Sequence, residues 1–101
     1  MQIKLKNKTI SSVPFSNSEV AWRIEDAISG LQYFKDSERI VLGGDVLTTS
    51  LKYTYDNWYY NPVLDQSLRL NIDQSVEVAS KYILEYLRRN GTGYFIVFVV
   101  R

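Results

Sequence analysis

The segment that decides the fold of this chain is Gly43-Gly44-Asp45-Val46, followed by Tyr53-Thr54-Tyr55-Asp56-Asn57-Trp58-Tyr59-Tyr60. It contains two consecutive glycines, two acidic residues, a tryptophan and four of the eight tyrosines. Amphipathic periodicity alone does not require this combination. The segment therefore predicts a folded hairpin, with a turn near Thr49 and Ser50, that has either a special backbone or a binding surface.

Hydrophobic patterns before this segment predict a strand, a loop and a helix. Residues 1–6 alternate lysine with apolar side chains, which is typical of a half-exposed strand. Residues 11–16 contain a proline and are expected to form a loop. The S-x-x-E spacing from Ser16 to Glu19 is that of a capping box, so a helix is expected from there to Asp36.

Three further strands are expected after this helix. An apolar run at residues 39–42 predicts a short strand that enters the double glycine, and a longer strand is expected from Leu51. Asn61-Pro62 ends the longer strand, because proline lacks the backbone donor of a sheet ladder. Residues 94–100 are apolar on both faces, which is typical of a buried central strand.

A second helix is expected near Asn71, with Gln74 at the capping position and Asn90-Gly91 as a left-handed cap. Each helix has an apolar stripe that predicts packing against a sheet. The stripes are Val20, Ile24, Ala27, Ile28, Leu31 and Phe34 in the first helix, and Ile72, Val76, Ala79, Ile83, Tyr86 and Leu87 in the second.

These elements predict one small α+β domain over residues 1–101, with two helices packed on a four-stranded mixed or antiparallel sheet in the order β-α-β-β-α-β. A ferredoxin-like fold has the same order of elements. In that fold the last strand lies at a sheet edge, which does not suit the apolar run at residues 94–100. The strand order is therefore left open.

The composition excludes several classes of function. The chain has neither cysteine nor histidine, which excludes a disulfide framework, a thiolate metal site and a Ser-His-Asp triad within it. Twelve basic residues against eleven acidic ones give no basic field for nucleic acid. The longest apolar run is too short to span a bilayer, and we expect no targeting segment. A cytoplasmic protein without metal or cofactor is expected.

The double glycine and the nearby acids each have two interpretations. Gly43-Gly44 lacks the surrounding residues of a phosphate-binding loop, so a bulge or a tight turn is favoured. Asp45 and Asp56 lie on neighbouring predicted strands and together suit acid/base chemistry, although a lone Asp beside glycine or asparagine more often bonds to local backbone. Trp58 is expected to be buried and structural.

The order and spacing of several motifs resemble those of a known family. In order, these motifs are Ile40-Val41-Leu42, Gly43-Gly44-Asp45-Val46, Tyr55-Asp56-Asn57-Trp58-Tyr59, the helical Ser75, Ala79, Tyr82-Ile83 and Tyr86, and the terminal Tyr94-Phe95. Over residues 18–99 this succession resembles the immunity protein 40 family, small proteins from bacterial polymorphic-toxin loci. The resemblance implies a non-enzymatic inhibitor that binds and neutralises a cognate protein toxin.

We expect the toxin to contact Asp45 and Asp56 together with Tyr53, Tyr55 and Tyr59, because carboxylates beside tyrosines suit a basic cleft. Gly43, Gly44, Asn57 and Trp58 are expected to be the structural part of the motif. The rival placements are the sheet face around Lys4 and Lys6, and the outer helix faces.

Two other functions stay open. One is a small enzyme or ligand-binding domain that uses Asp45 and Asp56, which a deep pocket holding both carboxylates would favour. The other is a structural, homo-oligomeric adaptor. For the immunity protein itself we expect a monomer or a weak dimer.

Overall fold

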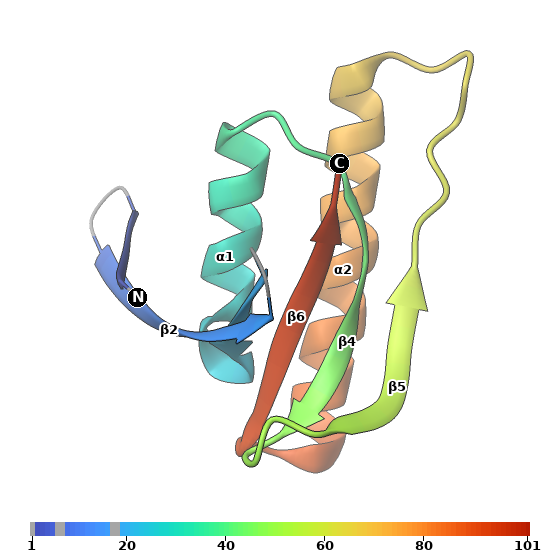
Figure 1. The fold of residues 1–101 in the computed structure, drawn as a ribbon. Coiled ribbons are helices and arrows are strands. Elements are labelled where there is room, and N and C mark those ends of the chain that lie inside the picture. Colours follow the sequence, from blue (N-terminus) through green and yellow to red (C-terminus); the bar gives the residue numbers. More distant parts are fainter. Residues whose placement is uncertain (1, 6–7, 17–18) are drawn as a thin grey trace.

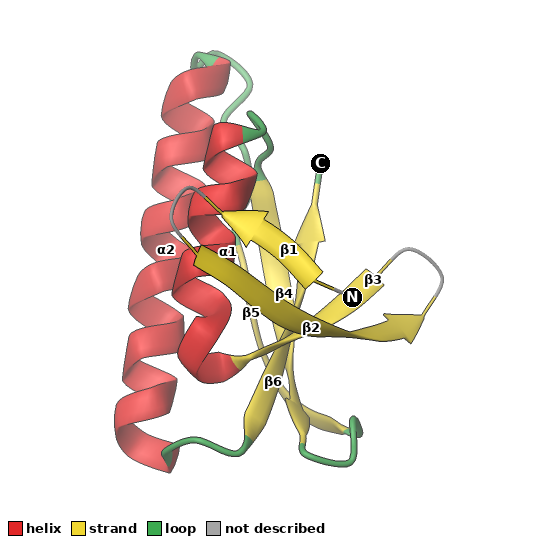
Figure 2. Cartoon of the chain, turned by 90° about the vertical axis from the view of Figure 1, so that its left-hand side faces the viewer, coloured by secondary structure: helices red, strands yellow, loops and turns green. Residues whose placement is uncertain are grey.

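The computed structural model describes residues 2–5, 8–16 and 19–101. Within these residues, two helices cover one face of a six-stranded antiparallel sheet with the strand order β1-β2-β3-β6-β4-β5 (Figures 1 and 2). The predicted α+β class is confirmed, but the sheet has six strands instead of the four expected. The elements are β1 (Gln2–Leu5), β2 (Lys8–Ser16), β3 (Glu19–Arg23), α1 (Ile24–Asp36), β4 (Val41–Thr48), β5 (Tyr53–Tyr59), α2 (Leu68–Asn90) and β6 (Tyr94–Val100).

The main core lies between the helices and the sheet. Trp22 of β3 meets Phe34 of α1 and Phe98 of β6 edge-on, with ring centroids 6.3 Å apart in both contacts. Ala79 and Ile83 of α2 are fully buried in the same cluster. Phe34, Ala79 and Ile83 belong to the apolar stripes of the two helices, so the stripes position both helices on the sheet.

The last strand, β6, lies in the middle of the sheet as its composition predicts. It pairs with β3 on one side and with β4 on the other. Ile96 and Phe98 enter the main core, whereas Val97 is buried in a smaller cluster on the opposite face. This central position excludes the ferredoxin-like arrangement and resolves the strand order.

The prediction for residues 11–23 is wrong. The expected loop at residues 11–16 is the second half of β2, and Glu19–Arg23 forms β3, so the helix begins only at Ile24. The capping-box interpretation fails because Glu19 pairs with Ser16 in an antiparallel ladder, while residues 17 and 18 lie outside the described ranges. Pairing on both sides of β3 outweighs the local helix signal.

Pro14 is tolerated inside β2 for a local reason. Among the described residues, the ladder to β1 ends at Ser11, and only β3 pairs with the strand around Pro14. The register to β3 then shifts between Pro14 and Ser16, which marks a bulge. Proline is found in sheets at such bulges and free edges. Of the two lysines named above, Lys4 lies in β1, and Lys6 lies outside the described residues.

The second helix starts three residues earlier than expected. Ser67 is the N-cap, because its Oγ accepts a hydrogen bond of 3.1 Å from the backbone N–H of Leu70. Gln74 therefore lies inside α2 and plays no part in capping. Gly91 is the C-cap, as expected, and donates its N–H to Leu87 O, but the expected left-handed conformation is wrong, because its φ of +76° is combined with a ψ of −168°.

Candidate functional site

The double glycine lies inside β4, where Trp58 of β5 leaves no room for side chains. A Cβ on Gly44 would overlap the indole ring of Trp58 and would lie 2.9 Å from the carbonyl oxygen of Val97. A Cβ on Gly43, which has φ +156°, would overlap the carbonyl oxygen of Trp58. Neither glycine therefore has room for a Cβ, and the register shift between β4 and β6 next to Gly43 agrees with the bulge that the sequence favours.

Trp58 is buried, as predicted, with 6 % of its surface exposed. Its indole stacks on Tyr82 of α2 with centroids 5.0 Å apart, and it meets Phe98 of β6 edge-on at 6.0 Å. Gly44 therefore lies directly against this indole, and the contacts of Trp58 hold the edge strand β5 against α2.

Ser75, another residue of the family pattern, has a structural role. Its fully buried hydroxyl accepts a hydrogen bond of 3.0 Å from the backbone N–H of Val41 and donates one of 2.8 Å to Ile72 O. The register between β4 and β6 shifts between Val41 and Gly43. Ser75 thus satisfies a buried backbone donor next to this bulge.

The pleat of β5 separates the candidate site residues onto two faces. Trp58 and Asp56 face α2, because Asp56 Oδ2 accepts a hydrogen bond of 2.9 Å from Tyr86 of that helix. Tyr53 faces away from the helices and meets Phe15 of β2 edge-on, with centroids 5.7 Å apart. Asp56 therefore does not belong to the same surface as Tyr53 and the other candidate tyrosines of β5.

Asp45 lies on the helix-free face of the sheet. Its ladder partner in β6 is Val97, which belongs to the buried cluster on that face, and its partner in β5 is Asn57. Asp45 and Asp56 therefore face opposite sides of the sheet. A shared catalytic site for these two carboxylates has no geometric basis here.

The environment of Asp45 disfavours its charged form. Burial raises the pKa of its carboxyl group, and the nearby charge of Glu19 raises the pKa further. The side chain is half-buried, and among the described residues no hydrogen bond or ion pair compensates its charge. A cation or a hydrogen-bond donor from a partner would therefore meet a carboxylate that lacks one.

We name this region the open sheet face and define it by Asp45, Tyr53, Tyr55, Tyr59 and Val99. The exposed fractions of Tyr55 and Tyr59 are 85 % and 76 %. Tyr55 has a positive φ of 69°, in the stretch where the register between β4 and β5 shifts. The bulge turns its side chain outward, close to Tyr53, with ring centroids 6.5 Å apart.

The open sheet face is curved. Phe15 of β2 touches Tyr53 of β5, although β3, β6 and β4 separate these strands in the sheet. This contact requires the sheet to coil strongly toward the face that carries no helix. The surface thus offers a partner a coiled aromatic sheet with a carboxylate among the tyrosines.

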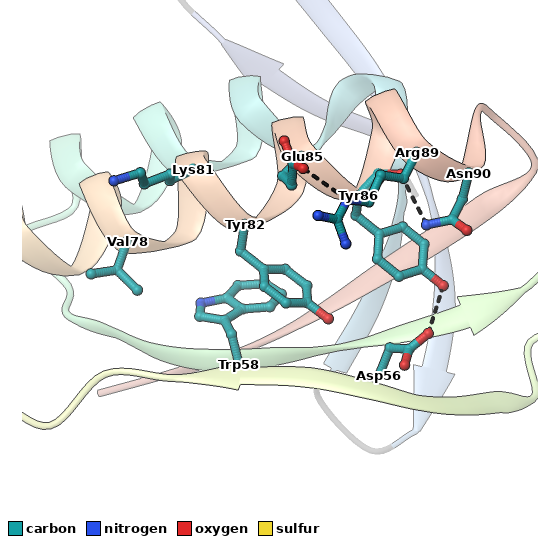
Figure 3. Close-up of a pocket in the computed structure, with 9 residues that line it drawn as sticks. All are labelled: Asp56, Trp58, Val78, Lys81, Tyr82, Glu85, Tyr86, Arg89 and Asn90. Atoms are coloured by element: carbon teal, nitrogen blue, oxygen red, sulfur yellow. Dashed lines mark hydrogen bonds and ion pairs between the residues drawn. The ribbon is translucent and has the colours of Figure 1, made fainter.

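A groove of about 660 Å³ lies on the helix side, between β5 and α2 (Figure 3). Trp58, Tyr82 and Tyr86 form its apolar wall, and Figure 3 shows the hydroxyl of Tyr86 pointing to Asp56. The pKa of Tyr86 is raised to about 12, chiefly by burial and in addition by the hydrogen bond to Asp56. The i, i+4 spacing of Tyr82 and Tyr86 is the sequence signal for this wall.

In the part of the chain that the structure describes, acidic residues do not gather in a group of three that could hold a metal ion. Among the helices of the same residues, none is long and apolar enough to cross a membrane.

Comparison with known proteins places the chain in a family. No curated protein and no solved structure matches it at a significant level. Residues 6–100, nearly the whole chain, match the family described as immunity protein 40. The glycines under Trp58, the buried Ser75 and the aromatic wall of α2 all lie within this match. The chain therefore belongs to the immunity protein 40 family.

Proposed function

We propose that this protein protects a bacterial cell by binding a cognate polymorphic toxin at a fixed ratio and covering its working surface, without turnover. Membership of an immunity protein family supports the general role. The cytoplasm of the producing cell is the proposed place of action, because self-protection requires the inhibitor where the toxin is made.

The observation that carries the proposal is the open sheet face. It offers three exposed tyrosines around a half-buried carboxylate without a partner among the described residues. Tyrosine supplies a large, rigid contact area at low entropic cost and is enriched among the residues that dominate binding energy. We assign the toxin contacts to Asp45, Tyr53, Tyr55 and Tyr59, and we exclude Asp56 because it is engaged with Tyr86 on the other face.

The chemistry of this face favours a basic group on the toxin. A lysine or arginine that reaches Asp45 would lower the pKa of the carboxyl group and would lie beside aromatic faces that attract cations. The association rate should then fall as salt concentration rises, because salt screens the attraction between the two proteins.

The first experiment is co-expression with the toxin encoded next to this protein. The immunity protein should restore growth, and the two proteins should co-purify at a fixed ratio. If neither result is obtained with a toxin of verified activity, the immunity function is refuted. Light scattering on the isolated protein separates this function from an adaptor, whose mass would lie well above 11.8 kDa.

The second experiment locates the surface. Asp45→Asn, Tyr55→Ala and Tyr59→Ala should each weaken toxin binding in folded protein. Asp36→Asn is the matched control, because Asp36 is an exposed carboxylate at the end of α1. If rescue holds while all three variants bind as the parent does, the function stands and the assigned surface is wrong.

A further inference from the structure

The segment between β5 and α2, residues 61–67, is held in place by one buried side chain. Asn71 of α2 is 6 % exposed and pairs with both backbone groups of Val63. Its Nδ2 donates to Val63 O at 3.1 Å, and its Oδ1 accepts from Val63 N at 3.0 Å. The side-chain amide thus supplies the hydrogen-bond donor and acceptor that a neighbouring strand would supply in a sheet.

Other side chains complete this arrangement. Gln66 Nε2 lies 2.8 Å from both Asn71 Oδ1 and Gln74 Oε1, and the hydroxyl of Tyr60 lies 2.9 Å from Asn71 Oδ1. The backbone N–H of Gln66 donates to Val63 O at 3.2 Å and closes a turn. The conformation of the loop is therefore determined by several bonds to a regular helix.

This well-held turn presents apolar side chains to solvent. Leu64, directly after Val63 in the turn, is 98 % exposed. Val63 is 49 % exposed, and Leu68, the first residue of α2, is 56 % exposed. In Figure 1 the segment forms the upper right corner, beyond the arrowhead of β5. Single exposed leucines are ordinary, but two consecutive exposed apolar residues on a fixed, protruding turn, followed by an exposed leucine at the start of α2, indicate a contact surface.

The shape and charge of the turn indicate what it fits. A protruding leucine is buried by a concave apolar pocket and not by a flat surface. Binding costs little conformational entropy here, because the backbone is already ordered. Asp65, beside Leu64, is exposed and has no ion pair among the described residues, which favours a basic rim around the pocket.

We propose that residues 61–67 form an anchor that inserts Leu64 into an apolar pocket of the toxin, with a basic rim of that pocket facing Asp65. This inference rests on the proposed function and adds a second contact, separate from the open sheet face. Hot-spot residues of this kind fill pockets on the partner and account for much of the binding energy.

The test compares two exposed leucines. The dissociation constant of the toxin complex is measured for Leu64→Ala and for Leu84→Ala, the matched control, because Leu84 is 54 % exposed on α2. Leu64→Ala should weaken binding by about tenfold or more, the usual effect of truncating an anchor. Its melting temperature should match that of the parent, and Leu84→Ala should bind as the parent does. Asp65→Asn should weaken binding by about threefold and reduce its salt dependence.

The possible failures are distinguishable. If Leu64→Ala binds like the parent while the open-face variants bind more weakly, the anchor is refuted and the proposed function stands. If the parent itself fails to bind an active toxin, the proposed function is refuted and the anchor with it. If Leu64→Ala instead converts a homodimer to a monomer in light scattering, the pocket belongs to a second copy of this chain and the toxin assignment is wrong.

Discussion

The two faces of β5 use similar residues for different purposes. On the helix side, Trp58 and Asp56 contact Tyr82 and Tyr86 of α2 and hold the edge strand to the helical layer. On the open side, Tyr55 and Tyr59 are largely exposed and have no such contacts with the helices. A strand alternates its side chains, so one compact motif contains both structural and surface residues. The presence of an aromatic residue in the motif therefore does not indicate its role.

The largest effect should come from the structural side. Trp58→Ala removes a ring that stacks on Tyr82 and covers Gly44, so it should lower the free energy of unfolding by about 3–5 kcal/mol. Tyr59→Ala on the open face should change it by less than about 0.5 kcal/mol. Urea unfolding of both variants measures the contrast. If both variants lost the same free energy of unfolding, the two faces of β5 would contribute equally to stability.

Gly44→Ala should be the next most damaging change. The new Cβ would overlap the indole of Trp58, while Val97 O lies on the other side at 2.9 Å. Overpacking of this kind costs about 1–3 kcal/mol. The melting temperature of the variant measures the loss, and the double variant Gly44→Ala/Trp58→Phe should recover part of it. A silent Gly44→Ala would remove the support for the tight packing of these strands.

The Tyr86–Asp56 pair predicts a dependence on alkaline pH. Tyr86 has a pKa raised from 10.0 to about 12 in the folded protein, so the fold favours the protonated phenol. Its contribution to stability should be complete below pH 10 and should be lost as the pH rises through about 12. NMR titration of the tyrosine ring carbons detects the late transition. In Asp56→Asn this transition should move to lower pH, whereas an unshifted transition would contradict the role of the pair.

Asp45 should show the smallest and most informative effect, because stability and binding change in opposite directions. Its raised pKa means that the folded protein disfavours the carboxylate. Asp45→Asn should therefore slightly raise the melting temperature at neutral pH, and this gain should disappear at pH below the ordinary value of 3.8, where the parent is protonated in both states. The same variant should bind the toxin more weakly. A variant that is destabilised and still binds would place Asp45 on the structural side.

Several elements could be predicted from the sequence because local pattern and tertiary structure agree there. The apolar stripes of both helices (except Val20, which lies in β3), the burial of Trp58 and the central position of β6 follow from where apolar side chains recur. The double glycine also correctly indicated a bulge, because the register between β4 and β6 shifts next to Gly43.

The first strands could not be predicted for a physical reason. Residues 11–23 contain a proline and a capping-box pattern, yet β2 and β3 form because β6 offers a partner for β3 on its other edge. This pairing joins segments more than seventy positions apart, since Trp22 lies opposite Ile96. A local pattern contains no information about such a partner.

By itself, the sequence determined the class of the domain, the helical stripes, the buried central strand and the absence of histidine and cysteine chemistry. Only the tertiary structure decided which face each residue of the motif occupies. The pairing of Asp45 with Asn57 and the contact of Asp56 with Tyr86 place the two acids on opposite faces. The tertiary structure also revealed that Asn71 hydrogen-bonds to the backbone of Val63 and so fixes the turn in which Leu64 is exposed. These features depend on strand register and on contacts between distant elements, which local periodicity does not specify.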